Sequence, residues 1–302
     1  MMINAIVTMP PYAPYLEETL KHPAVEGIRL NTVMPFKGAL EDLLKGLEDK
    51  TLAEGKSLWV DLKCRQLRVK DYGVPPFTEI RLSHSIKLKT PAKAYFSDRS
   101  EGSTVLEADG DRLIMQEGPK RVVGPGESVT ITDSSLAVDG YLTDLDKRYI
   151  EAGNKAGIRN YMLSFVEGRE DVEGFKKYSP GSNIIAKIES KKGLKYAKNE
   201  WNGESRLMAA RGDLYMQLHW PHEIIPALEM ILSKDPNAIV ASRIFDSMAQ
   251  GPEPSSGDIS DADNLLRMGY KSIMLGDDVC LNRSSLISSL NLFSAIKGRY
   301  ER

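Results

Sequence analysis

The chain has few cysteines, few histidines and no excess of basic charge. Its 302 residues include two cysteines, Cys64 and Cys280, and four histidines, and neither set has the spacing of metal ligands. Two such cysteines form no disulfide framework, which is typical of a protein from a reducing cytosol. A formal net charge of −2 gives no positive field for nucleic acid or for an anionic membrane.

Long apolar runs and a secretion signal are also missing. The amino terminus has no basic segment followed by an extended apolar stretch, and no apolar run is long enough to span a bilayer. We therefore expect a cytoplasmic protein that binds neither nucleic acid nor a membrane. With 41% hydrophobic and 27% charged residues, the composition is that of a globular protein with a large core.

Short apolar segments alternate with stretches of helical period along most of the chain. Eight of these segments read as strands, at residues 5–9, 27–31, 57–63, 160–165, 183–189, 206–213, 238–243 and 272–278. Strands that are apolar on both faces and separated by helices indicate a parallel sheet. Eight strand–helix units in this length predict an α/β fold of the closed (β/α)₈ TIM-barrel type.

A middle section has a different pattern. From residue 69 to about residue 139, short alternating runs and Gly/Pro turns replace the helices. This predicts a small all-β domain, residues 69–139, inserted after the third strand of a barrel made of residues 1–68 and 140–302. An insert at this position would lie over the mouth of the barrel as a lid.

The segment IIAKIES places Lys187 and Glu189 two residues apart in an otherwise apolar strand. Side chains two residues apart in a strand point to the same face. Two charges on a buried face are costly to desolvate unless something there requires them. The alternative interpretation is a structural ion pair with no chemical role.

Nearly every predicted strand ends in a polar or charged residue. These residues are Arg29, Asn31, Asp61, Lys63, Arg68, Ser164, Lys187, Glu189, Arg211, Asp213, Ser242, Arg243, Asp277 and Asp278. Because TIM-barrel chemistry is built at the carboxyl ends of the strands, we expect these side chains to converge there. Arg29 and Asp61 could instead pair across neighbouring strands and do nothing else.

The residue types at these strand ends indicate a metal site. Glu189 and Asp213 are carboxylates on adjacent predicted strands and could share one divalent cation. Oxygen ligands without nearby His or Cys favour Mg²⁺ or Mn²⁺ over zinc. The backbone N–H groups of Gly212 and Asp213, where a helix could begin, would cradle a carboxylate or a phosphate.

The cations at the strand ends indicate an anionic substrate. Arg29 and Arg68 could hold an anionic oxygen group, and Lys187 could neutralise charge that develops on an oxygen. Together with the metal, they predict a small, multiply anionic substrate such as a phosphorylated or plain 2-oxo acid.

Several longer motifs resemble the pyruvate kinase family in order and spacing. They are GIRLN, DLKCRQLR, LTDLDK, LSFVEGREDV, IIAKIES, LMAARGDL and the run from SRIFDSM through PEPSSGDISDADN to SIMLGDD. The resemblance covers roughly residues 1–68 and 139–298. It implies a TIM barrel with a β lid and Mg²⁺- and K⁺-assisted phosphoryl transfer from phosphoenolpyruvate to ADP, through a metal-bound enolpyruvate.

The resemblance also implies roles for five charged residues. Lys187 resembles the lysine that stabilises the enolate and the transferring phosphoryl group. Glu189 and Asp213 resemble the Mg²⁺ ligands. Arg29 and Arg68 resemble the arginines that hold the phosphoryl group.

Four further positions match the family in part. The turn at Gly212 and Asp213 resembles the one whose N–H groups bind the substrate carboxylate, and Ser242 stands where the family has a threonine beside the substrate methylene. Asn31 and Asp61 resemble two of the K⁺ ligands.

The chain departs from the family pattern in the rest of the cation and nucleotide sites. Residues 32–34 lack the serine that binds K⁺ and the histidine on the nucleotide side, residues 61–68 lack a threonine ligand, and residues 276–278 replace serine-glycine-glutamate. The lid is short, without its Gly-rich, Lys-containing stretch, and the effector-binding C-terminal domain has no counterpart. The resemblance therefore leaves the use of K⁺ and of a nucleotide open, and oligomerisation as well.

Three hypotheses follow. The chain could be a pyruvate-kinase-like phosphotransferase that acts on phosphoenolpyruvate and pyruvate. It could be a Mg²⁺-dependent lyase, aldolase or decarboxylase of a 2-oxo acid on the same scaffold. It could also bind phosphoenolpyruvate or pyruvate without catalysis.

Overall fold

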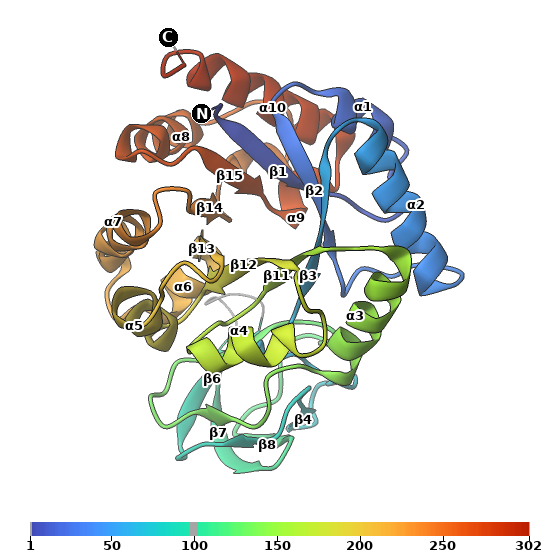
Figure 1. Cartoon of the computed structure of the whole chain (residues 1–302). Helices are drawn as coiled ribbons and strands as arrows, with labels where there is room; N and C mark the ends of the chain where they lie inside the picture. The colour runs from blue at the N-terminus through green and yellow to red at the C-terminus, as the bar shows by residue number, and fades with distance from the viewer. Residues whose placement is uncertain (1, 97–101, 302) are drawn as a thin grey trace. The chain divides into compact units, whose positions relative to one another are not determined.

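Eight parallel strands form a closed barrel in the computed structural model of the chain, which describes residues 2–96 and 102–301 (Figure 1). The strands are β1 (Asn4–Thr8), β2 (Val25–Asn31), β3 (Ser57–Leu62), β11 (Asn160–Leu163), β12 (Asn183–Ile188), β13 (Arg206–Ala210), β14 (Ile239–Ala241) and β15 (Ser272–Leu275). Around the barrel they follow the order β1-β15-β14-β13-β12-β11-β3-β2, and β1 pairs with β2 to close the ring. The predicted (β/α)₈ barrel is confirmed.

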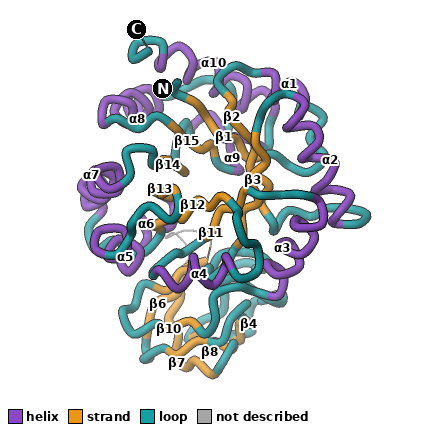
Figure 2. The backbone as a smooth tube through the Cα atoms, in the orientation of Figure 1, coloured by secondary structure: helices purple, strands orange, loops and turns teal. Residues whose placement is uncertain are grey.

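Helices follow the barrel strands along the chain and lie outside them (Figure 2). They are α1 (Leu16–Lys21), α2 (Leu40–Ala53), α3 (Asp144–Ala156), α4 (Arg169–Lys176), α5 (Lys191–Asn199), α6 (Arg211–Gln217), α7 (Ile224–Lys234), α8 (Ser256–Met268), α9 (Asp277–Cys280) and α10 (Arg283–Lys297), with short 3₁₀ turns η1 (Pro221–Glu223) and η2 (Asp246–Ala249). The helix α6 begins at Arg211, directly after β13, where the sequence suggested a helix start. None of the helices in the described part of the chain is long and apolar enough to cross a bilayer.

The barrel interior is an apolar layer beneath a polar one. Its apolar side chains form one cluster of buried residues: Ile6, Met162, Ile185, Met208, Ala210, Ile239, Ala241 and Met274, with Trp59 packed against them. On four strands a polar residue follows two positions later: Thr8 after Ile6, Asp61 after Trp59, Ser164 after Met162, and Lys187 after Ile185. Because strand side chains alternate between faces, the same geometry that fills the core aims these polar groups into the mouth of the barrel.

Residues Lys63–Asp146 form a second unit, separate from the barrel unit of Met1–Leu62 and Lys147–Arg302. Its strands are β4 (Glu79–Arg81), β5 (Ile86–Lys87), β6 (Ala92–Phe96), β7 (Gly102–Asp109), β8 (Arg112–Met115), β9 (Val129–Ile131) and β10 (Ala137–Val138). Five of them form an antiparallel sheet in the order β4-β8-β7-β6-β9, and β10 pairs with β5. The all-β character predicted for this insert is confirmed, and its function as a lid stays a prediction.

The two ends of this second unit are tied together by Asp146. Its carboxylate accepts hydrogen bonds from the backbone nitrogens of Lys63 at 2.8 Å and Cys64 at 3.0 Å. It also accepts from the hydroxyl of Thr143 at 2.7 Å, and the Asp146 backbone nitrogen donates back to that hydroxyl at 3.0 Å. This reciprocal pair caps the start of α3, so one buried carboxylate fixes both the exit from β3 and the start of the next barrel helix.

Candidate active site

Four of the predicted charged residues meet inside the mouth of the barrel. Arg29 on β2, Asp61 on β3, Lys187 on β12 and Glu189 just after β12 are all buried, with at most 6% of each residue exposed. They come from strands far apart in the sequence, and a chain of ion pairs joins them. The expected convergence at the strand ends therefore holds for these four.

Arg29 is held on several sides. Its Nε donates to Asp61 Oδ2 at 2.8 Å, and Nη2 donates to the same oxygen at 2.5 Å. Its Nη1 donates to Thr8 Oγ1 at 2.9 Å and to Asp277 Oδ1 at 3.0 Å. Burial opposes the charge of the guanidinium, but Asp61 and Asp277 outweigh it and raise the pKa of Arg29. Arg29 is thus a permanently charged group whose nitrogens all have acceptors already.

Lys187 is the second buried cation, and its three N–H donors match three acceptors. Its Nζ lies 2.8 Å from Ser164 Oγ, 3.3 Å from Asp61 Oδ1 and 3.2 Å from Glu189 Oε1. Ser164 in turn donates its hydroxyl proton to the backbone oxygen of Leu62 at 2.8 Å, which leaves a lone pair for the lysine. Burial alone would lower the pKa of Lys187. The negative charges of Asp61 and Glu189 outweigh burial and raise the pKa above its ordinary value, so the lysine stays protonated.

Glu189 lies between the lysine and a second carboxylate. Its Oε2 accepts from the backbone nitrogen of Phe165 at 2.8 Å. Burial and the negative charge of Asp213 raise the pKa of Glu189, and Lys187 acts against them. Two carboxylates that repel each other, of which Glu189 is buried, are suited to a shared cation, which would relieve that repulsion.

The donor set at Glu189 and Asp213 fits a hard divalent cation. Both residues offer carboxylate oxygens, the ligands that Mg²⁺ prefers, and Mg²⁺ is usually held by one or two carboxylates together with water or substrate. Among the described residues, no group of three or more His, Cys, Asp or Glu side chains is arranged to hold a metal ion. A metal here would take its other ligands from substrate and water.

Gly212 and Ser242 are neighbours, as the predicted substrate-binding set requires. A Cβ atom on Gly212 would lie 3.5 Å from both Cβ and Oγ of Ser242. Ser242 follows β14 with a φ of 69°, a left-handed conformation that is rare for a residue other than glycine. Their roles in holding a carboxylate and a methylene group stay predictions.

Asn31 and Asp61, the predicted K⁺ ligands, have other partners. Asn31 Nδ2 donates to Asp277 Oδ2 at 3.0 Å. The two oxygens of Asp61 face Arg29 and Lys187. Two cationic side chains thus already meet the carboxylate that was expected to bind K⁺, and its role as a K⁺ ligand stays a prediction.

Arg68 belongs to the second unit. Its guanidinium donates to the backbone oxygen of Gly126 at 2.6 Å and to Oε1 of Gln66. Its predicted role in holding a phosphoryl group is not tested by these contacts.

Two residues of this network are absent from the predicted site. Thr8 donates to the backbone oxygen of Leu275 at 2.9 Å and accepts from Arg29, so it links β1, β15 and β2. Its place as the polar end of the first strand is the signal that could have found it. Asp277 was predicted as a polar end of the eighth strand but was left out of the predicted site residues, although it contacts both Arg29 and Asn31.

Comparison with known sequences places the chain in a family. The family model described as "Pyruvate kinase, barrel domain" matches residues 46–281, more than half of the chain. The chain belongs to the pyruvate kinase family. This confirms the resemblance read from the motifs, and it makes the chain a relative of enzymes that are built on the same barrel.

Individual relatives are similar at low identity. A pyruvate kinase of Methanocaldococcus jannaschii is 25% identical over 280 residues, which cover 86% of this chain and 61% of that protein. A pyruvate kinase of Borreliella burgdorferi is 23% identical over 309 residues, which cover 92% of this chain and 63% of that protein. A pyruvate kinase of Thermotoga maritima is 27% identical over 209 residues, which cover 63% of this chain and 44% of that protein. The chain therefore spans less than two thirds of the length of each of these relatives.

Proposed function

We propose that the chain is a pyruvate-kinase-like, Mg²⁺-dependent enzyme that acts on phosphoenolpyruvate or pyruvate. The observation that carries the proposal is the buried ammonium group of Lys187, 3.2 Å from Glu189. The negative charge of Asp213 in turn raises the pKa of Glu189. A fixed cation beside two carboxylates is an arrangement for stabilising negative charge on a substrate oxygen. The names of the relatives, all pyruvate kinases, support the same choice of substrate.

Each residue has a part in this proposal. Lys187, whose donors already have three acceptors, would exchange its longest contact, 3.3 Å to Asp61, for a substrate oxygen and stabilise the charge that develops there as the enol form of pyruvate is made or consumed. Glu189 and Asp213 hold the metal, which when bound supplies further charge neutralisation. The backbone N–H groups of Gly212 and Asp213 orient the substrate carboxylate, and Ser242 lies beside its methylene group.

The existing contacts of Arg29 bear on which reaction the chain can catalyse. In phosphoryl transfer, Arg29 and Arg68 would hold the transferred group. However, Arg29 already contacts Asp61, Thr8 and Asp277, so a phosphoryl group would have to displace one of them. Asp277 is the partner with an exposed side chain, 37% against 0% for Asp61, and is the one that would yield.

This occupation of Arg29 favours a second candidate, a lyase or decarboxylase of a 2-oxo acid. Such a reaction passes through the same enolate of pyruvate but needs no group to hold a phosphate. Lys187, Glu189 and Asp213 would keep their roles, and Arg29 would act as a fixed positive charge that holds Asp61 in place.

One set of assays separates these candidates. The chain is incubated with phosphoenolpyruvate, ADP and Mg²⁺, with and without K⁺, and pyruvate formation is followed. Turnover supports the phosphotransferase. If no pyruvate forms in that assay while oxaloacetate or a 4-hydroxy-2-oxo acid is consumed, the lyase hypothesis is supported and the phosphotransferase hypothesis is wrong. If neither reacts and phosphoenolpyruvate only raises the melting temperature, the chain is a binding protein, and the proposal of an enzyme is wrong.

Lys187→Met tests the proposed chemistry in whichever reaction is found. We expect turnover to fall roughly 10²- to 10⁴-fold, as for the loss of a positioned catalytic group, while divalent-metal affinity is largely kept. Lys195→Met, at an exposed position of α5, is the matched control and should change neither. Unchanged turnover in Lys187→Met would exclude a catalytic role for this lysine.

A further inference from the structure

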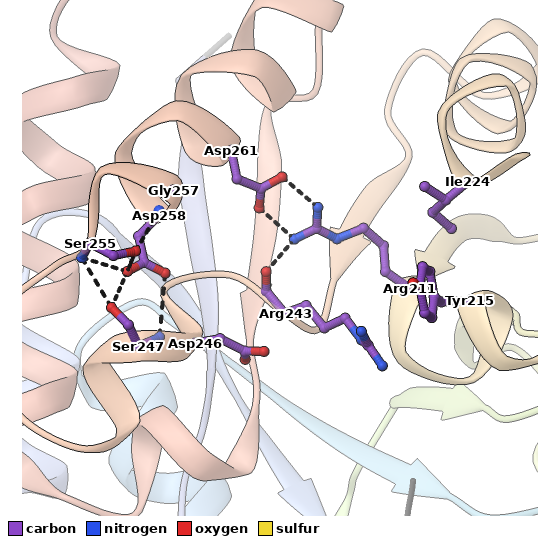
Figure 3. A pocket seen from close by; sticks show the side chains of 10 residues that line it. All are labelled: Arg211, Tyr215, Ile224, Arg243, Asp246, Ser247, Ser255, Gly257, Asp258 and Asp261. Carbon is purple, nitrogen blue, oxygen red and sulfur yellow. Dashed lines mark hydrogen bonds and ion pairs between the residues drawn. The ribbon is translucent and has the colours of Figure 1, made fainter. Parts of the chain in front are cut away.

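A cavity of about 520 Å³ lies in the barrel unit, beside the ends of β13 and β14 and the first turn of α8 (Figure 3). Its volume is in the range of pockets for small metabolites. Tyr215 and Ile224 form an apolar part of its wall, and Arg243 and Asp246 provide charge. None of these four residues belongs to the Lys187 network.

Most other charged groups around the cavity are fully paired. Arg211 donates to both oxygens of Asp261, at 2.8 and 2.7 Å, in a two-point ion pair. It also donates to the backbone oxygens of Ser242 at 3.0 Å and Arg243 at 2.6 Å. Figure 3 shows these contacts joining Arg211 to Asp261 and to the backbone of Arg243. Four of the five N–H donors of Arg211 are therefore engaged by the protein, and its charge is compensated by Asp261.

Asp258 is satisfied in the same way. Its carboxylate accepts from the hydroxyl of Ser255 at 2.7 Å, from the Ser255 backbone nitrogen at 2.8 Å, and from the hydroxyl of Ser247. These contacts form the cap of α8. Hydrogen bonds to the charged form outweigh burial and lower the pKa of Asp258.

Arg243 and Asp246 differ from these neighbours. The Arg243 guanidinium lies over the ring of Tyr215, 4.5 Å from its centroid, and forms no hydrogen bond or ion pair with the residues that the structure describes. The Asp246 carboxylate likewise has no such partner within residues 2–96 and 102–301. Figure 3 accordingly draws no contact from either charged group. Burial, together with the negative charge of Asp278, raises the pKa of Asp246 against the opposing effect of Arg243.

The backbone that carries these two groups is held in an uncommon shape. Ser242, Arg243 and Phe245 have φ values of 69°, 55° and 58°, all in the left-handed region. Such residues cost on the order of 1 kcal/mol or more each and persist only where surrounding contacts enforce them. Arg211 supplies that enforcement by binding the Ser242 and Arg243 carbonyls. The segment therefore has a constrained backbone, from which the Arg243 and Asp246 side chains extend to the cavity.

We propose that this cavity binds a small zwitterion, a free α-amino acid with a short apolar side chain. Arg243 takes the carboxylate through its two-pronged guanidinium, and Asp246 takes the ammonium group. Tyr215 and Ile224 contact the apolar side chain. This site is separate from the proposed enzymatic function and does not depend on it.

The charges around the cavity argue for a zwitterion over a simple ion. The lining holds two arginines and three aspartates, so an anion alone would meet uncompensated negative charge. A cation alone would meet the positive charge of Arg243, which no carboxylate of the described residues pairs with. A ligand with both charges a few bonds apart gives Arg243 and Asp246 a partner each at once.

Calorimetric titration of the full chain with L-valine tests the proposal, with two matched analogues. Isovalerate keeps the carboxylate and lacks the amine, and isobutylamine keeps the amine and lacks the carboxylate. We expect valine to bind saturably with a dissociation constant of about 1 mM or tighter, and each analogue to bind about tenfold to a hundredfold more weakly. If valine shows no binding at tens of millimolar, or if one analogue binds as well as valine, the proposal is wrong.

Two substitutions then assign the groups. Arg243→Gln and Asp246→Asn are each expected to weaken valine binding about tenfold or more. Lys195→Gln on α5 and Glu229→Gln on α7, both exposed and outside the cavity, remove the same charges and should leave binding unchanged. Equal weakening in the control variants would show a general effect of charge and would overturn the assignment. The analogue comparison on the unaltered chain decides the matter even if a variant folds poorly.

Discussion

Arg29 and Arg243 both lie toward the carboxyl ends of barrel strands, yet their surroundings are opposite. Arg29 is 6% exposed and contacts two carboxylates and a hydroxyl, whereas Arg243 is exposed and its guanidinium, among the described residues, contacts only the face of Tyr215. A buried charge must be compensated by the protein itself, because water is not available to do so. An exposed arginine is solvated and can stay unpaired. The buried arginine therefore stabilises the fold through its contacts with the protein, whereas the exposed one is accessible to a ligand.

The largest expected effect comes from removing Arg29. Arg29→Leu leaves the fully buried Asp61 with Lys187 as its only cationic partner among the contacts described above, which should lower the free energy of unfolding by about 3–5 kcal/mol. Arg243→Leu should cost at most about 1 kcal/mol, because only the contact with an aromatic face is lost. Urea denaturation of the two variants measures the difference.

A double variant makes this comparison sharper. Arg29→Leu combined with Asp61→Leu removes the stranded carboxylate and should recover part of the stability lost in the single variant. Equal costs for Arg29→Leu and Arg243→Leu would mean that burial does not separate the two arginines.

The next effect concerns the two carboxylates of the proposed metal site. Glu189→Gln should weaken Mn²⁺ binding by at least about tenfold, because it removes a charged oxygen ligand. Glu229→Gln is the control for the loss of one surface charge. Mn²⁺ affinity can be followed by electron paramagnetic resonance of the free ion, and an unchanged affinity would remove Glu189 from the ligand set.

A smaller effect is expected at Asp277, the exposed partner of Arg29. Asp277→Asn removes one negative charge 3.0 Å from Arg29 Nη1 and should leave that nitrogen more available to a phosphate. We expect phosphoenolpyruvate to bind about fivefold more tightly to the variant, while oxalate is little affected. Tighter binding of both ligands alike would show that Arg29 does not distinguish phosphate from carboxylate.

The smallest effect contrasts two aspartates at the same cavity. Asp258→Asn weakens the cap of α8 and should lower the free energy of unfolding by about 0.5–1 kcal/mol at pH 7. Asp246→Asn removes a carboxylate that has no hydrogen-bond or ion-pair partner in the described part of the chain, and it should leave the free energy of unfolding unchanged. Because the pKa of Asp258 is lowered by folding, its contribution is complete above the ordinary value of 3.8 and is lost as the pH falls through the lower folded-state pKa. Thermal unfolding at pH 7 and near pH 2 should therefore show a difference for Asp258→Asn only at pH 7.

Much of the fold could be predicted because it depends on local pattern. The eight apolar strands and the period of two that places Lys187 and Glu189 on one face are properties of short segments. The alternation of strand and helix then leaves few topologies other than the barrel. The change of pattern after residue 68 marked the all-β insert for the same reason.

The contacts within the site could be predicted only in part, because they depend on register between distant strands. The sequence suggested that Arg29 and Asp61 could pair, and they do. That Asp61 also binds Lys187, 126 residues away, follows from the tilt and register of strands that are not adjacent in the chain. The contact between Asp277 and Arg29 could not be predicted for the same reason, since it spans 248 residues.

The position of Asp61 has a consequence for how the cylinder closes. Sliding β3 by one residue would turn this carboxylate to the outside, and sliding it by two would move it about 7 Å along the strand. Either change would leave two buried cations, on β2 and β12, without their common anion. The ion cluster therefore favours the observed register of β3, and with it one shear number for the barrel, because a shifted register would leave buried charges without partners.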